Sequence, residues 1–238
     1  MTLQPFPDDW SRALVVVAHP DDMEYGGSGA VARWTDAGKE VTYLLVTRGE
    51  AGIDSIPPVE AGPLRENEQR AACAAVGVTE VEFLDHPDGV VEYGLPLRRD
   101  IAATIRRRRP ELVVTGNFAA RWPGGGLNMA DHIHTGRAVL DACRDAGNRW
   151  VFPSAGGDPW PGVRYLAVAG SPQPTHGVDI GPTFDRAVAS LAAHEVYLAA
   201  LGDGAMADPE AFLRSQAEVA AEQLPGATLA VGFELLTL

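Results

Sequence analysis

The chain is poor in cysteine, in basic residues and in long apolar runs. Only 2 of its 238 residues are cysteine, and Cys73 and Cys143 both lie in alanine-rich, helix-like segments. Two such cysteines form neither a disulfide framework nor a CxxC metal site, so we expect buried thiols in a reducing compartment. The first nine residues lack the basic and apolar segments of a signal peptide. These absences together favour a cytoplasmic protein.

Lysine and arginine number 19 against 32 acidic residues, which gives a formal net charge of −13. This negative charge argues against nucleic acid or an anionic membrane as the partner. No apolar window approaches the length of a membrane span. The one basic cluster, Arg106 to Arg109, precedes Pro110 and is typical of a helix C-terminus rather than of a binding patch.

Apolar strand-like segments alternate with helical patterns along the chain. The predicted strands cover residues 13–18, 41–47, 81–84, 112–115, 163–168 and 228–235. The predicted helices cover residues 24–37, 64–76, 96–108, a segment through 146 capped by Asn128 or Asp131, 184–201 and 209–221. This alternation predicts an α/β fold, a Rossmann-like three-layer sandwich with a mostly parallel sheet. Because no repeat or low-complexity linker interrupts it, we expect a single domain over residues 1–238.

Two long segments, residues 48–63 and 116–130, are rich in glycine, proline and charge, and each follows a predicted strand. Loops of this length in a compact domain are more often functional than idle. Since both leave the carboxyl end of the predicted sheet, we expect them to form the walls or the lid of a pocket.

A histidine and two aspartates come directly after the first predicted strand. Residues 13–18 are apolar enough to be buried on both faces of a sheet, and His19, Asp21 and Asp22 follow. Open α/β sheets place their ligands at this end of their strands. His19 and Asp22 are close enough in the chain to bind one metal ion, which leaves Asp21 free as a base.

A third metal ligand should come from another element at the same edge. Residues 131–134, with two histidines, follow a predicted strand and its glycine-rich loop. Two histidines and one carboxylate leave a metal position open for water or substrate. A metal in such a site activates water and polarises a carbonyl group, which predicts hydrolysis of an amide or ester.

Residues 19–24, His-Pro-Asp-Asp-Met-Glu, resemble the AHPDDxE signature of the LmbE-like (PIG-L) family of zinc-dependent N-acetylglucosaminyl deacetylases. Weaker resemblances lie in residues 47–50, 64–68, 131–136 and 190–194. The resemblance implies that His19, Asp22 and His132 bind Zn²⁺, with another divalent metal such as Fe²⁺ as an alternative. It further implies that Asp21 is the general base and that Arg65 contacts the sugar.

The chain departs from the family pattern beside His132. The family usually has the motif HxDH there, and Met129 occupies the position of its first histidine. A thioether cannot donate a proton or carry charge. Leu127 stands where some relatives have an oxyanion-binding tyrosine. Metal binding is therefore better supported by the sequence than the usual rate of catalysis.

These features predict a hydrolase that removes an N-acyl group, most simply N-acetyl, from a small amino-sugar conjugate. One alternative is a thiol-conjugate amidase with the same site, and another is a metal- and sugar-binding homologue whose catalysis is impaired by Met129. A non-haem iron oxygenase is disfavoured because its usual scaffold is all-β. We expect a small-molecule substrate and no nucleic acid or membrane partner, and the sequence leaves a homo-oligomer open.

Overall fold

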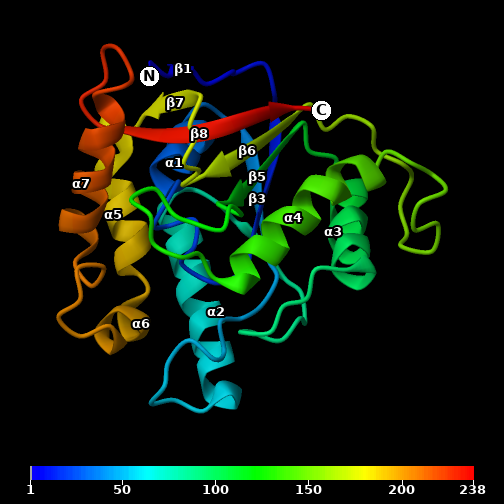
Figure 1. Cartoon of the computed structure of the whole chain (residues 1–238), viewed down its shortest axis with the longest axis horizontal. Helices are drawn as coiled ribbons and strands as arrows, with labels where there is room; N and C mark the ends of the chain where they lie inside the picture. The colour runs from blue at the N-terminus through cyan, green and yellow to red at the C-terminus, as the bar shows by residue number, and fades with distance from the viewer. Residues whose placement is uncertain (1) are drawn as a thin grey trace.

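The computed structural model describes residues 2–238, which form an eight-stranded sheet covered by helices on both faces (Figure 1). The strands are β1 (Gln4–Pro5), β2 (Arg12–Val17), β3 (Glu40–Leu45), β4 (Glu80–Phe83), β5 (Leu112–Gly116), β6 (Tyr165–Ala169), β7 (His176–Asp179) and β8 (Ala230–Thr237). The helices are α1 (Ser28–Asp36), α2 (Pro58–Ala75), α3 (Leu95–Arg108), α4 (Ala130–Asp145), α5 (Phe184–Ala192), α6 (Glu195–Ala200) and α7 (Pro209–Ala221).

The sheet is mostly parallel, which confirms the predicted fold class. Its strand order is β1-β7-β8-β6-β5-β2-β3-β4. Only β8 runs against its neighbours, β6 and β7, among the strands of residues 2–238. β2 has parallel partners on both sides, β3 and β5, so its carboxyl end opens at the middle of the sheet edge, where such folds bind ligands.

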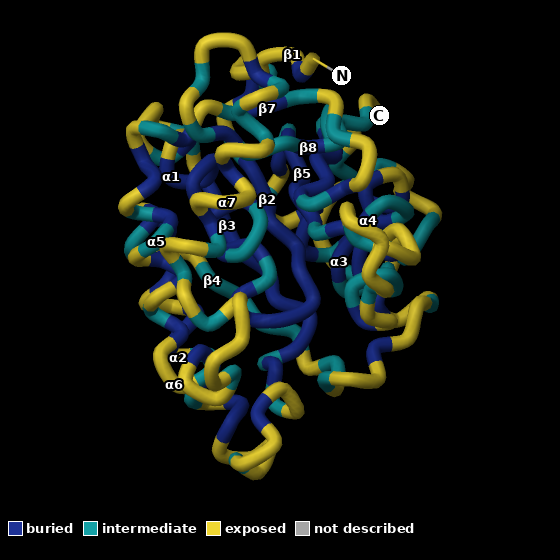
Figure 2. Tube along the Cα trace, turned by 60° about the vertical axis from the view of Figure 1, so that its left-hand side comes forward, coloured by how far each residue is buried: buried dark blue, intermediate teal, exposed yellow. Residues whose placement is uncertain are grey.

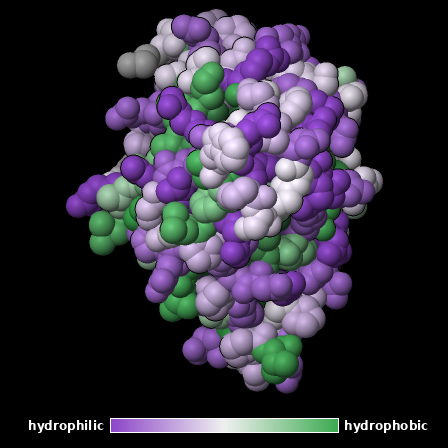
Figure 3. All heavy atoms as spheres, turned by 90° about the vertical axis from the view of Figure 1, so that its right-hand side faces the viewer, coloured by the Kyte–Doolittle hydropathy of each residue, from purple (hydrophilic) through white to green (hydrophobic). Residues whose placement is uncertain are grey.

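The core has two halves, one on each face of the sheet. Val15 and Val17 of β2 pack with residues from α1, α2, α5 and α7, while Leu14 and Val16 pack with α3 and α4. This alternation is the two-residue period of a strand buried on both faces. Figure 2 shows the strands as a buried centre inside more exposed helices. On the face in Figure 3, hydrophilic atoms predominate and hydrophobic atoms form separate patches.

The helix expected at residues 24–37 begins only at Ser28. The intervening residues form turns, because Asp21 has a positive φ of 83° and the Met23 carbonyl accepts from the backbone N–H groups of Gly26, Gly27 and Ser28. The signature residues thus lie in a turn between β2 and α1 rather than on a helix.

Two further helix boundaries were predicted wrongly. The helix expected from residue 64 begins at Pro58, because proline is favoured at the first helical position and Pro63 is tolerated inside α2. The loop expected over residues 48–63 is therefore shorter and ends before Pro58. The helix expected at 184–201 is two helices, α5 and α6, which are separated at His194.

Neither Asn128 nor Asp131 caps α4, because its N-cap is Met129 and no side chain bonds there. β1 and β7 were not predicted, since β1 has only 2 residues and the four residues of β7, His-Gly-Val-Asp, form no apolar run. Cys73 and Cys143 are both buried free thiols. Within residues 2–238, none of the helices combines the length and the apolar character that crossing a membrane requires.

Candidate metal centre

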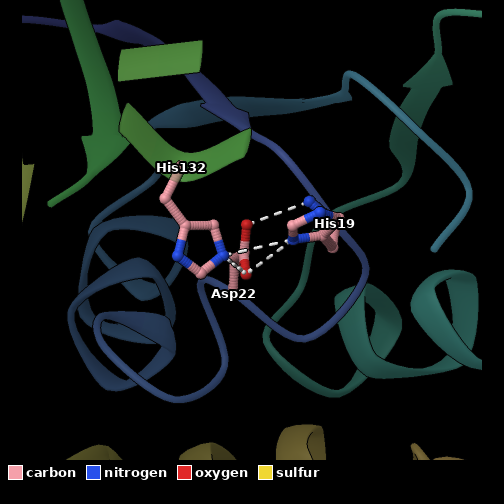
Figure 4. A group of neighbouring side chains, drawn as sticks. All are labelled: His19, Asp22 and His132. Carbon is pink, nitrogen blue, oxygen red and sulfur yellow. Dashed lines mark hydrogen bonds and ion pairs between the residues drawn. The ribbon is translucent and has the colours of Figure 1, made fainter. Parts of the chain in front are cut away.

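His19, Asp22 and His132 converge at the carboxyl end of β2, where the first turn of α4 reaches the sheet edge (Figure 4). His132 Nε2 lies 3.1 Å from His19 Nδ1 and 3.0 Å from Asp22 Oδ1. The third side of the triangle, from His19 Nδ1 to Asp22 Oδ1, is 3.5 Å. The structure thus brings together the three residues expected to bind metal, although 110 residues separate Asp22 from His132.

The outer nitrogen of each ring faces an acceptor. His132 Nδ1 lies 3.0 Å from Asn128 Oδ1, whose orientation is fixed because the amide nitrogen donates to two loop carbonyls. His19 Nε2 lies 3.0 Å from Asp88 Oδ1 and 3.3 Å from Asp131 Oδ2. Both outer nitrogens must therefore carry hydrogen, and in the neutral rings the inner nitrogens present lone pairs. In that neutral form three acceptors face one another, an arrangement that requires a positive charge among them, either a proton on one ring or a metal ion.

This donor set fits a divalent cation. Zinc bonds of about 2.0–2.2 Å in a tetrahedral arrangement place neighbouring ligands about 3.3–3.6 Å apart. The three distances in this site lie between 3.0 and 3.5 Å. An ion seated among these atoms would replace the repulsion between their lone pairs with attraction, and it would leave a fourth position open.

Electrostatics also favour positive charge at this point. Burial lowers the pKa of His19 and of His132, but the Asp22 carboxylate outweighs burial and holds both pKa values above the ordinary value. Burial raises the pKa of Asp22, and the two histidines more than reverse this, so its pKa lies well below the usual range. The carboxylate is therefore ionised and prepared to balance a cation.

Two further carboxylates, Asp88 and Asp131, form a second group with His19. Asp131 accepts hydrogen bonds from the backbone of Gly89 at 2.7 Å and of Val91 at 3.1 Å. Asp88 accepts one from the backbone of Ala51 at 2.8 Å. Because the backbone holds both carboxylates, we interpret them as fixing the His19 ring in place. His134 belongs to neither group, and its Nδ1 lies 2.6 Å from the Val91 carbonyl.

Asp21, the residue expected to act as base, belongs to neither group. Its side chain is buried, and Oδ2 lies 3.3 Å from Arg65 Nη2. Burial raises the pKa of Asp21, Arg65 opposes this, and Asp22 adds to it, so that the pKa is about 7. A carboxylate with this pKa exchanges protons readily near neutral pH.

Arg65 is only 2% exposed and lies beneath Asp21, well inside α2 rather than in its first turn. Its guanidinium donates to the Gly49 carbonyl at 3.0 Å and to the Pro20 carbonyl at 2.8 Å, and it lies 4.2 Å from the centre of the Tyr197 ring. Arg65 is therefore a buried cation and not one on the surface. Contact with a sugar stays a prediction, because these donors already have partners in the protein.

The loop before α4 covers the other side of His132. The Trp122 ring lies edge-on to the His132 ring, with centroids 5.7 Å apart. Leu127 is 76% exposed and Met129 is 54% exposed, so both side chains face solvent next to this turn. Sequence reasoning missed Trp122, Asn128 and Tyr197 as neighbours of the site, since nothing in their local pattern distinguishes them from ordinary loop and helix residues.

The chain is similar to several known proteins. Residues 14–143 match the family model described as PIG-L, GlcNAc-PI de-N-acetylase. A diacetylchitobiose deacetylase of Thermococcus kodakarensis is 28% identical over 198 residues, which cover 81% of this chain and 72% of that protein.

A 1D-myo-inositol 2-acetamido-2-deoxy-alpha-D-glucopyranoside deacetylase of Kineococcus radiotolerans is 32% identical over 187 residues. That alignment covers 64% of this chain and only 50% of the relative. The structure of N,N'-diacetylchitobiose deacetylase from Pyrococcus horikoshii superposes with a TM-score of 0.86 at 22% identity, covering 96% of this chain and 84% of that one. This last likeness concerns the fold.

Proposed function

The chain belongs to the PIG-L family of GlcNAc-PI de-N-acetylases, and on that premise we propose that it is a metal-dependent hydrolase of amino-sugar conjugates. The reaction is removal of an N-acyl group, most simply N-acetyl. Zn²⁺ is the proposed metal, held by His19, Asp22 and His132. We further propose that it acts in the cytoplasm as one domain.

One observation carries the proposal: three acceptor atoms face one another at 3.0–3.5 Å, with the outer ring nitrogens of both histidines held by acceptors. Facing lone pairs repel, so this arrangement needs a cation among the three atoms, and their spacing matches the ligand spacing of a tetrahedral zinc ion. The named relatives act on N-acetylated sugars, which supports the substrate class.

A bound divalent cation would lower the pKa of water and polarise the acyl carbonyl. The chain's own residues supply the proton transfers. Asp21, with a pKa of about 7, takes the proton of the attacking water and returns it to the leaving amine. Met129 supplies no second acid, so Asp21 serves in both steps.

The test is acetate release by the purified chain loaded with Zn²⁺. The panel holds N,N'-diacetylchitobiose, an N-acetylglucosaminyl inositol and an N-acetylcysteine conjugate of an amino sugar. We expect acetate from at least one of the first two, loss of activity with a chelator, and recovery when metal is returned. Cleavage confined to the amide that carries the cysteine would favour the thiol-conjugate amidase.

Met129 favours a second candidate function, a metal- and sugar-binding protein without turnover. This candidate predicts one metal per chain and saturable binding of N-acetylated sugars, with no acetate from any of them. Metal content and calorimetric binding therefore separate the two functions.

A further inference from the structure

Asp21 has an unusual backbone conformation. It is one of three non-glycine residues with positive φ in the part of the chain that the structure describes, and its φ is 83°. Residues with a Cβ rarely adopt this region, because Cβ approaches the neighbouring carbonyl oxygen. Such a conformation persists only where the surroundings impose it, and it concentrates at functional sites.

Two side chains of α2 hold the peptide unit that joins Pro20 to Asp21. Arg65 Nη2 donates to its carbonyl oxygen at 2.8 Å, and Gln69 Oε1 accepts from its N–H at 3.0 Å. The two side chains are four residues apart and lie on one face of the helix. Both polar groups of this peptide unit are therefore fixed, which sets its rotation about φ of Asp21.

Gln69 is itself fixed. It has no exposed surface, and its amide nitrogen donates to Glu24 Oε1 at 3.0 Å and to Cys73 Sγ at 3.3 Å. The amide cannot turn over without losing both partners, so its oxygen stays directed at Asp21. Glu24 therefore anchors Gln69.

The resulting turn separates two adjacent carboxylates. Asp22 directs Oδ1 at His132 and accepts from the His19 backbone through Oδ2 at 2.9 Å. Asp21 belongs to neither ligand group and instead pairs with Arg65, with Oδ2 3.3 Å from Nη2. A relaxed backbone would let Asp21 compete with Asp22 for the same cation.

We propose that Gln69 is a positioning residue: with Arg65 it orients the peptide before Asp21, and so keeps the Asp21 carboxylate off the metal and free to act as the base. This inference rests on the proposed function. Gln69 touches neither metal ligand nor substrate and acts only through Asp21.

The first test compares Gln69→Leu, which removes the acceptor, with Gln69→Glu, which keeps an oxygen facing the Asp21 N–H. We expect Gln69→Leu to lower kcat on the order of 10²-fold, with KM and metal content unchanged, because small displacements of a catalytic group have effects of this size. Gln69→Glu should retain most of kcat. Should Gln69→Leu fail to fold, Gln69→Asn, whose shorter side chain withdraws the oxygen, takes its place.

Ser190→Ala is the matched control. The Ser190 hydroxyl, on α5, is buried and donates at 2.8 Å to the carbonyl of Ala72, which lies on α2 with Gln69. Its loss removes a buried hydrogen bond of α2 without touching the peptide before Asp21, so kcat should stay unchanged. A loss of kcat equal to that of Gln69→Leu would overturn the proposal.

A double-mutant cycle tests whether Gln69 acts through Asp21. In an Asp21→Asn background, Gln69→Leu should lower the residual rate no further. A second loss of the same size would show an independent structural effect and overturn the proposal.

A readout without activity keeps this inference separate from the proposed function. With Gln69 present, the melting temperature of Asp21→Gly should be higher than that of Asp21→Ala. This difference in melting temperature should shrink when both variants also carry Gln69→Leu. Wild-type protein that releases no acetate refutes the hydrolase alone. An unchanged gap in melting temperature refutes the role of Gln69 alone.

Discussion

Replacing Asp21 with glycine should give a more stable protein than replacing it with alanine. At a φ of 83°, a residue with a Cβ carries a strain of about 1–2 kcal/mol that glycine does not. The buried alanine methyl group returns up to ~0.8 kcal/mol. Both variants lose the same ion pair with Arg65, so this contribution cancels. With the methyl contribution at its upper value, the net preference for glycine is ~0.2–1.2 kcal/mol, or up to about 5 °C in melting temperature for a domain of this size.

The measurement is thermal or urea unfolding of the metal-free variants, followed by circular dichroism. Metal is removed because a ligand that binds only the folded state would mask the difference. Asp100, in the middle of α3, provides the control pair. At this helical position the alanine variant should have a free energy of unfolding about 1 kcal/mol higher than the glycine variant, the reverse of the order expected at position 21. The reasoning about strain is refuted if alanine at position 21 is as stable as glycine or more so.

Four further outcomes are expected. His19→Ala should reduce the metal found by elemental analysis from about one ion per chain to background, and full retention would remove His19 from the ligand set. Asp21→Asn should keep the metal and lower kcat by about 10²–10⁴, whereas joint loss of metal would make Asp21 a ligand. Met129→His should raise the deacetylation rate by supplying the missing acid, and a lower rate would show that another group already serves. Burial lowers the pKa of His194 to about 3, so its neutral ring stabilises the fold fully above its unfolded pKa of about 6.5. That stabilisation is lost as pH falls from 6.5 towards 3. His194→Gln should therefore reduce the slope of the free energy of unfolding against pH, between about pH 6.5 and 5, by up to ~1.4 kcal/mol per pH unit.

The sequence predicts those parts of the fold and site that depend on local pattern. β2 is recognisable because its apolar run ends abruptly at His19, and parallel pairing then fixes that end beside the carboxyl ends of β3 and β5. His132 follows from the same logic, since it comes after β5 and its loop. Gln69 does not, because 48 residues separate it from Asp21 and nothing around it differs from a polar helix surface. The start of α2 was misplaced because Pro63 looks like a boundary, whereas Pro58 is the proline at the helix start.

Buried polar residues of α2 link the fold to the chemistry. Arg65, Gln69 and Cys73 lie at intervals of four on the face of the helix that packs under the turn after β2. An apolar stripe would serve packing better, since a buried guanidinium or amide costs stability unless its partners are in place. Here the partners of Arg65 and Gln69 include the carbonyl and the N–H of one peptide unit, the unit that precedes the strained residue. Polar burial, backbone strain and the raised pKa of Asp21 thus meet at a single position. Packing alone requires none of the three there, whereas a base that must stay beside a metal without binding it requires them together.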